Sequence, residues 1–113
     1  MSCTFCMITN GEIETGKIYE DKDMTVINDV HPQAPIHVLI IPRKHVESLL
    51  AAGQDDIELL GKMMIVASKV AKQLLIDKTG YRIVINTNRD AGQSVDHLHM
   101  HMLGGRPMKW PPG

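Results

Sequence analysis

The sequence predicts an antiparallel α+β fold, in which a sheet of about five strands carries one long helix on one face and a short helix at the N-terminus. Three observations predict it. Segments of strand length are separated by clusters of turn-forming residues, at 17–20, 24–28, 36–41, 81–86 and 97–103. One long stretch, 55–75, repeats apolar residues at helical spacing. Helices do not alternate regularly with the strands, so a parallel sheet is not favoured.

The N-terminal half predicts the short helix and three strands. The segment 3–10 is closed by a glycine, and two strands follow as a hairpin around a turn at 21–23. The loop 29–35 contains two prolines. The strand 36–41 is apolar enough to be buried, and it should end at Pro42 because proline has no N–H to donate to a sheet.

The C-terminal half predicts a helical turn through about residue 52, the long helix, two strands and an irregular tail at 106–113. Asp55 and Glu58 resemble a capping box, and acidic residues favour the positive end of a helix. Gly80 is predicted to end this helix. We expect the helix to cover the apolar face of the sheet. The residues 87–92 are predicted to be a polar loop.

The segment 93–105 carries the chemistry. Its three histidines, His97, His99 and His101, alternate with apolar residues, and a glycine pair follows them. Alternate side chains of a strand share a face, so the pattern predicts one face of imidazoles and one apolar face. Same-face neighbours lie about 7 Å apart, so three cations would repel one another and at least some rings should be neutral near pH 7.

A neutral imidazole can be a nucleophile, a base or a metal ligand. Metal-dependent hydrolysis usually adds a carboxylate, and no acidic residue follows Asp96, although earlier acids could reach the site through the fold. Nucleophilic attack on phosphorus would suit His99, which has a histidine on each side to stabilise the developing charge. Asn86 and Ser94 are neutral polar groups that could reach a phosphate or a leaving group.

Composition excludes several other classes. The 113 residues predict one small domain, 1–113, and the formal charge of −1 offers no electrostatic case for binding nucleic acid or an anionic membrane. The longest apolar run, 63–67, is too short to cross a bilayer. The N-terminus has no export signal, and the two cysteines lie too close together for a long-range disulfide. A cytoplasmic location is therefore the expectation.

With these residues in hand, the chain resembles the histidine-triad superfamily. The stretch His97 to Gly105 matches its His-x-His-x-His-x-x pattern, and Trp-Pro-Pro-Gly at the C-terminus resembles the branch of nucleotide-binding proteins that hydrolyse purine nucleoside phosphoramidates. The supporting stretches run nearly end to end, at 29–37, 41–45, 80–82, 92–95 and 104–113.

The resemblance implies a mechanism that needs no cofactor. His99, the central member of the triad with His97 and His101, would attack the α-phosphorus and carry a nucleotidyl-histidine intermediate that water then clears. The remaining implied roles are phosphate binding by His37, His101 and Asn86, leaving-amine contact by Ser94, ribose binding by Asp29, and an apolar slot for the purine base formed by Phe5, Ile8, Ile27 and Val30.

The resemblance also implies a homodimer whose sheets join edge to edge, with Trp110 reaching toward the partner's nucleotide site. From the residues alone, a single tryptophan in this tail fits an interface anchor or a core residue equally well. Two other functions stay open. Members of the superfamily also cleave dinucleoside polyphosphates, and a non-catalytic nucleotide-binding regulator could act through a protein partner.

A second constellation is Cys3-x-x-Cys6 with His45 and His97. Two thiolates at this spacing can share one tetrahedral zinc ion, and two histidines would complete its ligands. An isolated Cys-x-x-Cys pair is a weak signal, and two ordinary thiols explain it as well. Some superfamily members bind zinc in this way, so the resemblance implies that a metal here would be structural rather than catalytic. The sequence leaves open whether these residues bind zinc or are an ordinary pair of thiols.

Overall fold

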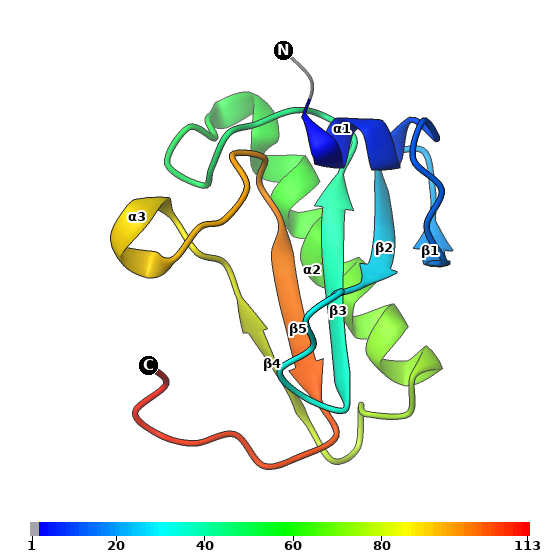
Figure 1. The fold of residues 1–113 in the computed structure, drawn as a ribbon, viewed down its shortest axis with the longest axis vertical. Helices are drawn as coiled ribbons and strands as arrows, with labels where there is room; N and C mark the ends of the chain where they lie inside the picture. The colour runs from blue at the N-terminus through cyan, green and yellow to red at the C-terminus, as the bar shows by residue number, and fades with distance from the viewer. Residues whose placement is uncertain (1–2) are drawn as a thin grey trace.

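The computed structural model describes residues 3–113 as a five-stranded sheet with its main helix on one face (Figure 1). All four pairs of neighbouring strands are antiparallel. The spatial order is β1 (Lys17–Glu20), β2 (Met24–Asn28), β3 (Ile36–Pro42), β5 (Met100–Gly104) and β4 (Tyr81–Val84). The predicted α+β class is confirmed.

The helix α2 (Ile57–Gln73) covers one face of the sheet, as predicted. Its buried side chains meet apolar residues that alternate along the central strands, in a cluster that includes Met24, Val26, Val38, Ile40, Met63, Val66, Val70, Met100 and Met102. Full burial of one such side chain contributes roughly 1.5–3 kcal/mol, so this layer supplies most of the cohesion. Within the described residues, no helix is both long enough and apolar enough to cross a membrane.

The helix α1 (Thr4–Thr9) packs on the opposite face. Phe5 and Ile8 contact a second apolar cluster that contains Ile27, Leu39 and Ile41. The central strand β3 is therefore buried on both sides, because its alternate residues face α2 and α1 in turn. Since α1 is short, part of this face stays open beside it, and the candidate site lies there.

The histidine segment differs in part from the prediction. The strand β5 begins only at Met100, so His97 and His99 precede it. The chain before the strand is instead fixed by the N–H of Leu98, which donates to the carbonyl of Val46 at 2.6 Å. The alternation survives, since Leu98 and Met100 join the α2 cluster and His99 faces Phe5 on the other side.

The prediction that Gly80 ends the long helix is wrong. The helix ends at Gln73, and Leu75 takes the left-handed conformation with φ 61°. The N–H groups of Leu75 and Ile76 close the last turn at 3.2 and 3.0 Å, in the pattern of a Schellman cap. Burial of Ile76 against the sheet accounts for the early stop, because it turns the chain toward β5 and β4.

The end of β5 needs a glycine for a different reason. A Cβ atom on Gly104 would lie 2.7 Å from Cδ1 of Ile76, so the side chain of Ile76 occupies the space. The next residue, Gly105, has φ +87°, and it passes close to Pro35 as the chain turns away from the sheet. The glycine pair thus ends the strand as predicted and also admits a core side chain.

The helical turn predicted to run to about residue 52 is present at its end, where the N–H groups of Ala51 and Ala52 donate to the carbonyls of Ser48 and Leu49, each at 3.1 Å. Residues 45–47, which precede this turn, have no regular secondary structure. The reason is competition for carbonyl groups: Gln93 Nε2 donates to the carbonyl of Glu47 at 2.7 Å, as Leu98 does to that of Val46. These long-range bonds replace those that a helix would form.

The predicted capping box of Asp55 and Glu58 is also wrong. Before α2 lies the short helix η1 (Gln54–Asp56), and Asp56 accepts a hydrogen bond from the N–H of Gly53 at 2.9 Å. The same carboxylate pairs with Lys44 Nζ at 2.6 Å. The strand β4 stops at Val84, short of the predicted range, and the predicted loop 87–92 contains one helical turn, α3 (Asn88–Ala91).

Candidate functional site

A cleft of about 520 Å³ opens beside α1, on the face of the sheet opposite α2. This volume lies in the range of small-ligand sites. Its apolar wall contains the four residues predicted to hold a base, Phe5, Ile8, Ile27 and Val30. Its polar wall contains four of the residues predicted for phosphate, ribose and leaving-group contacts, Asp29, Ser94, His99 and His101.

The ring of His99 lies in the wall of this cleft, and its hydrogen-bond partner fixes which nitrogen carries the hydrogen in the neutral form. Its Nδ1 lies 2.8 Å from the backbone carbonyl of His97, so Nδ1 carries the hydrogen and donates it. In the neutral ring the lone pair is therefore on Nε2. The edge-to-face contact with Phe5, at 5.0 Å between ring centroids, fixes the plane of the ring, and the residue is only 5% exposed. This is the arrangement that an attacking imidazole needs.

A hydrogen bond from the backbone N–H of Gln33 sets the tautomers of His37 and His101. The N–H of Gln33 donates to Nδ1 of His37 at 2.9 Å, so the neutral ring of His37 carries its hydrogen on Nε2. That Nε2 lies 2.9 Å from Nδ1 of His101 and donates to it. The hydrogen of His101 is consequently on its own Nε2. His101 lines the cleft, whereas His37 is buried behind it.

Electrostatics keep His101 neutral. Burial lowers its pKa, and the neighbouring His99 and His37 lower that pKa further, with Asp29 acting in the opposite direction. The carboxylate of Asp29 lies 3.3 Å from Nε2 of His37 and 3.8 Å from Nδ1 of His101. Its other oxygen accepts the N–H of His31 at 2.8 Å, which fixes its direction.

Two predicted nucleotide-binding residues do not line the cleft in this chain. Asn86 lies past the end of β4 and is half-buried. Trp110 is 82% exposed in the tail, where the guanidinium of Arg82 lies 6.0 Å from the centre of its ring.

Sequence reasoning also missed parts of the site. Leu39 lines the cleft, and its position two residues after His37 in a strand could have revealed it, since the two share a face. Gln33 and Arg106 were not predicted to act here, and no sequence pattern marks their contact. Six further lining residues were not predicted as site residues, namely Thr4, Thr15, Gly16, Asn28, His31 and Val95.

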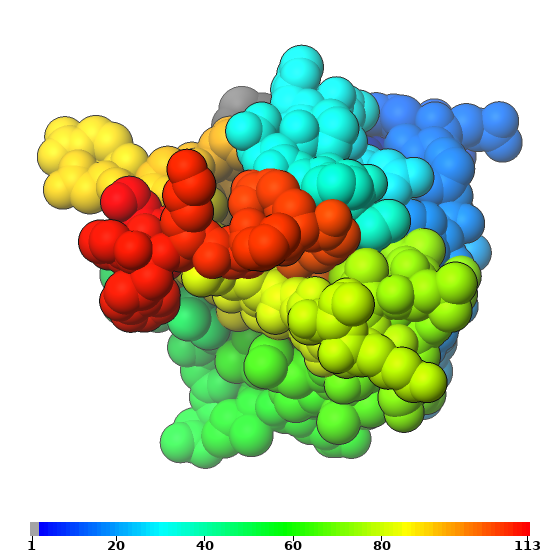
Figure 2. All heavy atoms as spheres, turned by 90° about the horizontal axis from the view of Figure 1, so that it is seen from below, coloured from blue at the N-terminus to red at the C-terminus, as the bar shows by residue number. Residues whose placement is uncertain are grey.

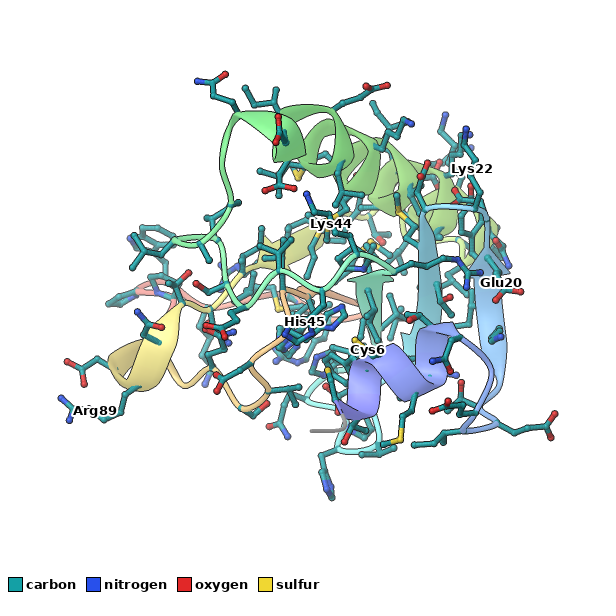
Figure 3. The ribbon with its side chains drawn as sticks, turned by 90° about the horizontal axis from the view of Figure 1, so that it is seen from above. Cys6, Glu20, Lys22, Lys44, His45 and Arg89 are labelled. Carbon is teal, nitrogen blue, oxygen red and sulfur yellow. The ribbon has the colours of Figure 1, made fainter. Side chains whose placement is uncertain are left out.

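Cys3, Cys6, His45 and His97 come together at the N-terminal end of α1, with one ligand atom from each lying within 4.8 Å of the others. Figure 3 shows His45 beside Cys6 of this helix. His97 Nδ1 lies 3.3 Å from Cys3 Sγ, 3.5 Å from Cys6 Sγ and 3.1 Å from His45 Nδ1, and the Cys6–His45 distance is 3.4 Å. Tetrahedral zinc with bonds of about 2.0–2.3 Å would hold its ligands at roughly this spacing.

The proton arrangement of this cluster also fits a metal ion. The Nε2 of His97 donates to the carbonyl of Pro42 at 2.7 Å, which leaves its Nδ1 lone pair turned toward the cysteines. Burial lowers the pKa of His97, so the ring is available in its neutral, ligating form. Burial and the adjacent Cys3 raise the pKa of the Cys6 thiol, so a bound metal would displace its proton.

The cluster of Asp29, His37 and His101 is a poorer metal site, although its ligand atoms are equally close. A metal would need the Nε2 lone pair of His37, but the N–H of Gln33 already uses Nδ1 and leaves the proton on Nε2. The three triad rings do not converge on one point either, because the free nitrogen of His97 faces the cysteines. This geometry does not favour metal-dependent hydrolysis by the triad.

Comparisons with known proteins identify the family to which the chain belongs. A family model described as the HIT domain matches residues 10–108. An uncharacterised HIT-like protein of Synechocystis is 47% identical over 109 residues, covering 96% of this chain and 95% of the relative. The purine nucleoside phosphoramidase of Escherichia coli is 43% identical over 104 residues, covering 92% and 87%. The crystal structure of a HIT family hydrolase from Legionella pneumophila matches with a TM-score of 0.97 and 46% identity, covering 99% and 100%.

Proposed function

Because this chain belongs to the HIT domain family, we propose that it hydrolyses purine nucleoside 5′-phosphoramidates through a nucleotidyl-histidine intermediate. The observation that carries the proposal is His99, whose unprotonated Nε2 belongs to a ring in the wall of a cleft with an apolar lining. The 43% identity to the Escherichia coli phosphoramidase supports the substrate class.

The reaction has two displacements at phosphorus. In the first, Nε2 of His99 forms a bond to the α-phosphorus, the P–N bond of the substrate breaks, and the amine leaves with a proton taken from solvent. In the second, the oxygen of a water molecule bonds to phosphorus, the bond to His99 breaks, one proton of the water returns to solvent, and the nucleoside 5′-monophosphate is released. The Nε2–H of His101 donates to a phosphate oxygen as charge develops there. Among these groups, His37 acts by holding His101 in the donating tautomer.

Other residues of the cleft contact the base, the ribose and the leaving amine of the substrate. The apolar wall of Phe5, Ile8, Ile27 and Val30 takes the purine base, and Asp29 accepts hydrogen bonds from the ribose hydroxyls. Ser94 contacts the leaving amine. Asn86 completes the phosphate contacts that the family resemblance implies.

A homodimer is part of the proposal. The strand β4 lies at one edge of the sheet, where it can pair with the same strand of a second copy. Trp110, exposed in this chain, would then reach the partner's nucleotide site. Light scattering after size exclusion tests this directly, with a mass of one chain as the contradicting result.

We also propose one structural zinc ion, held by Cys3, Cys6, His45 and His97. When bound, zinc ties the N-terminus and α1 to the histidine segment and fixes the ring of His97. None of the four zinc ligands is proposed to react with the substrate. His97 affects the reaction only through its backbone carbonyl, which orients His99. Zinc therefore contributes stability and position rather than chemistry.

Steady-state hydrolysis of an adenosine 5′-phosphoramidate tests the function, with adenosine monophosphate as the measured product. Repeated turnover separates the enzyme from a non-catalytic nucleotide-binding regulator, which would bind the nucleotide and release no product. A dinucleoside polyphosphate offered in parallel tests the third reading. Faster cleavage of the polyphosphate than of the phosphoramidate would overturn the proposed substrate class.

A further inference from the structure

We propose that Arg106 is a positioning residue for phosphoryl transfer, acting through the backbone of Gln33 on the pair His37 and His101. The inference rests on the function proposed above and adds a residue outside the cleft to its machinery. Arg106 follows β5 and does not line the cleft, so its effect on the reaction must pass through other groups.

The contact joins two parts of the chain that are far apart in sequence. The guanidinium of Arg106 donates to the carbonyl of Gln33 from Nε at 3.2 Å and from Nη2 at 2.8 Å. Its Nη1 donates to the carbonyl of Pro107 at 3.0 Å, which steadies the group on its own segment. Figure 2 shows the loop 29–35 lying against the segment that follows β5.

Gln33 is thereby held at both of its backbone polar groups. Its carbonyl accepts from Arg106, and its N–H donates to Nδ1 of His37 at 2.9 Å. Two hydrogen bonds on one residue restrict its φ and ψ angles and so the direction of its N–H. Among residues 3–113, the side-chain donors to the carbonyl of Gln33 come from Arg106, so removal of Arg106 leaves that carbonyl without them and loosens the peptide.

The direction of that N–H acts together with Asp29, whose carboxylate lies 3.3 Å from Nε2 of His37, to set where the protons lie. While Gln33 donates to Nδ1 of His37, the hydrogen of His37 stays on Nε2 and the hydrogen of His101 stays on its Nε2. If the N–H of Gln33 turns away, the ring of His37 can take the other tautomer. His101 must then donate through Nδ1, and its Nε2 loses the hydrogen proposed to meet the phosphate.

The first test reads the tautomer itself and needs no activity. Nitrogen-15 shifts of the imidazoles in the wild-type protein should show His37 protonated on Nε2 and unprotonated on Nδ1. In the variant Arg106→Ala the two nitrogens should move toward averaged values, and Arg106→Lys should restore part of the difference. A tautomer of His37 that does not change in Arg106→Ala overturns the inference.

The second test is kinetic. We expect Arg106→Ala to lower kcat for an adenosine 5′-phosphoramidate by about tenfold with little change in KM, because the misplaced donor matters most as charge develops. The variant Lys62→Ala is the charge-matched control. Lys62 is a partly exposed cation that pairs with Asp23 at 3.3 Å, away from the cleft, so its loss should leave kcat unchanged.

A double-mutant cycle identifies the route. If Arg106 acts through His37, then Arg106→Ala should cost less than about twofold in a His37→Ala background. Independent, multiplicative losses would overturn the inference. Failure of the proposed function would look different, since the wild-type protein itself would then not turn over the substrate while the tautomer measurement would remain interpretable. Thermal melts of each variant exclude a loss of fold as the cause.

Discussion

The Nδ1 atom of His99 lies 2.8 Å from the carbonyl oxygen of His97, so the ring in the cleft is oriented by the backbone of its own segment. The side chains of these two residues belong to different sites: His99 lines the cleft, whereas the free nitrogen of His97 faces Cys3 and Cys6. One short stretch of chain therefore joins the cluster of Cys3, Cys6, His45 and His97 to the candidate nucleophile through a single peptide carbonyl.

We predict that His99→Ala lowers turnover of the phosphoramidate by on the order of a thousandfold or more, because the attacking nitrogen is lost. Adenosine monophosphate should still bind within about threefold, since the apolar wall remains. Calorimetry measures the binding. A labelled nucleotide should be trapped on the wild-type protein and not on the variant. Hydrolysis by the variant at the wild-type rate would refute the mechanism.

Protein purified without a histidine tag should contain about one zinc ion per chain. Cys6→Ser should remove it and destabilise the fold by about 2 kcal/mol, which for a chain of this size lowers Tm by roughly 10 °C. Elemental analysis and thermal melts provide the measurements. A strong chelator should lower Tm in the same way while activity, assayed well below the new Tm, persists. Activity that disappears with zinc from a folded protein would assign the metal a catalytic role.

Acid should destabilise the fold through His101. Burial lowers the pKa of this ring in the folded protein below its ordinary 6.5, so the unfolded chain binds the proton more readily. Stability is therefore unaffected well above pH 6.5 and falls as the pH drops below that value, by at most about 1.4 kcal/mol per pH unit from this one group.

Urea unfolding between pH 8 and pH 5 measures this slope. The variant His101→Asn should show a shallower slope than the wild-type protein, and the difference isolates His101 from the effect of acid on the cluster of Cys3, Cys6, His45 and His97. His31→Asn changes an exposed loop histidine and is the control. An equal slope in all three proteins would show that the fold tolerates a proton on His101.

Gly104→Ala should destabilise the protein by about 1–3 kcal/mol, because the new Cβ would lie 2.7 Å from Cδ1 of Ile76. The variant Ile76→Val deletes that carbon, so the double variant should recover part of the loss. Urea unfolding of the four proteins in the cycle measures the coupling. Purely additive losses would mean that the two side chains do not compete for this space.

Local patterns were enough for most of the fold. The strands β1 and β2, the long helix and the packing of Met100 and Met102 against it follow from periods of two and of 3.6 residues, which short stretches reveal. The errors fall where distant contacts override local preference. The helix ends at Gln73 rather than at Gly80 because Ile76 is buried, and residues 45–47 form no helix because the segment before β5 takes the carbonyls of Val46 and Glu47.

For the site, the sequence alone determined which side chains are candidates for the chemistry, since three alternating imidazoles and a Cys-x-x-Cys pair are visible without any structure. The tertiary structure decided which nitrogen of each ring is free. That choice depends on hydrogen bonds from groups that the sequence does not place nearby, such as the carbonyl of Pro42 for His97 and the amide of Gln33 for His37. A proton on an imidazole follows its partners in space, and only the folded chain supplies them.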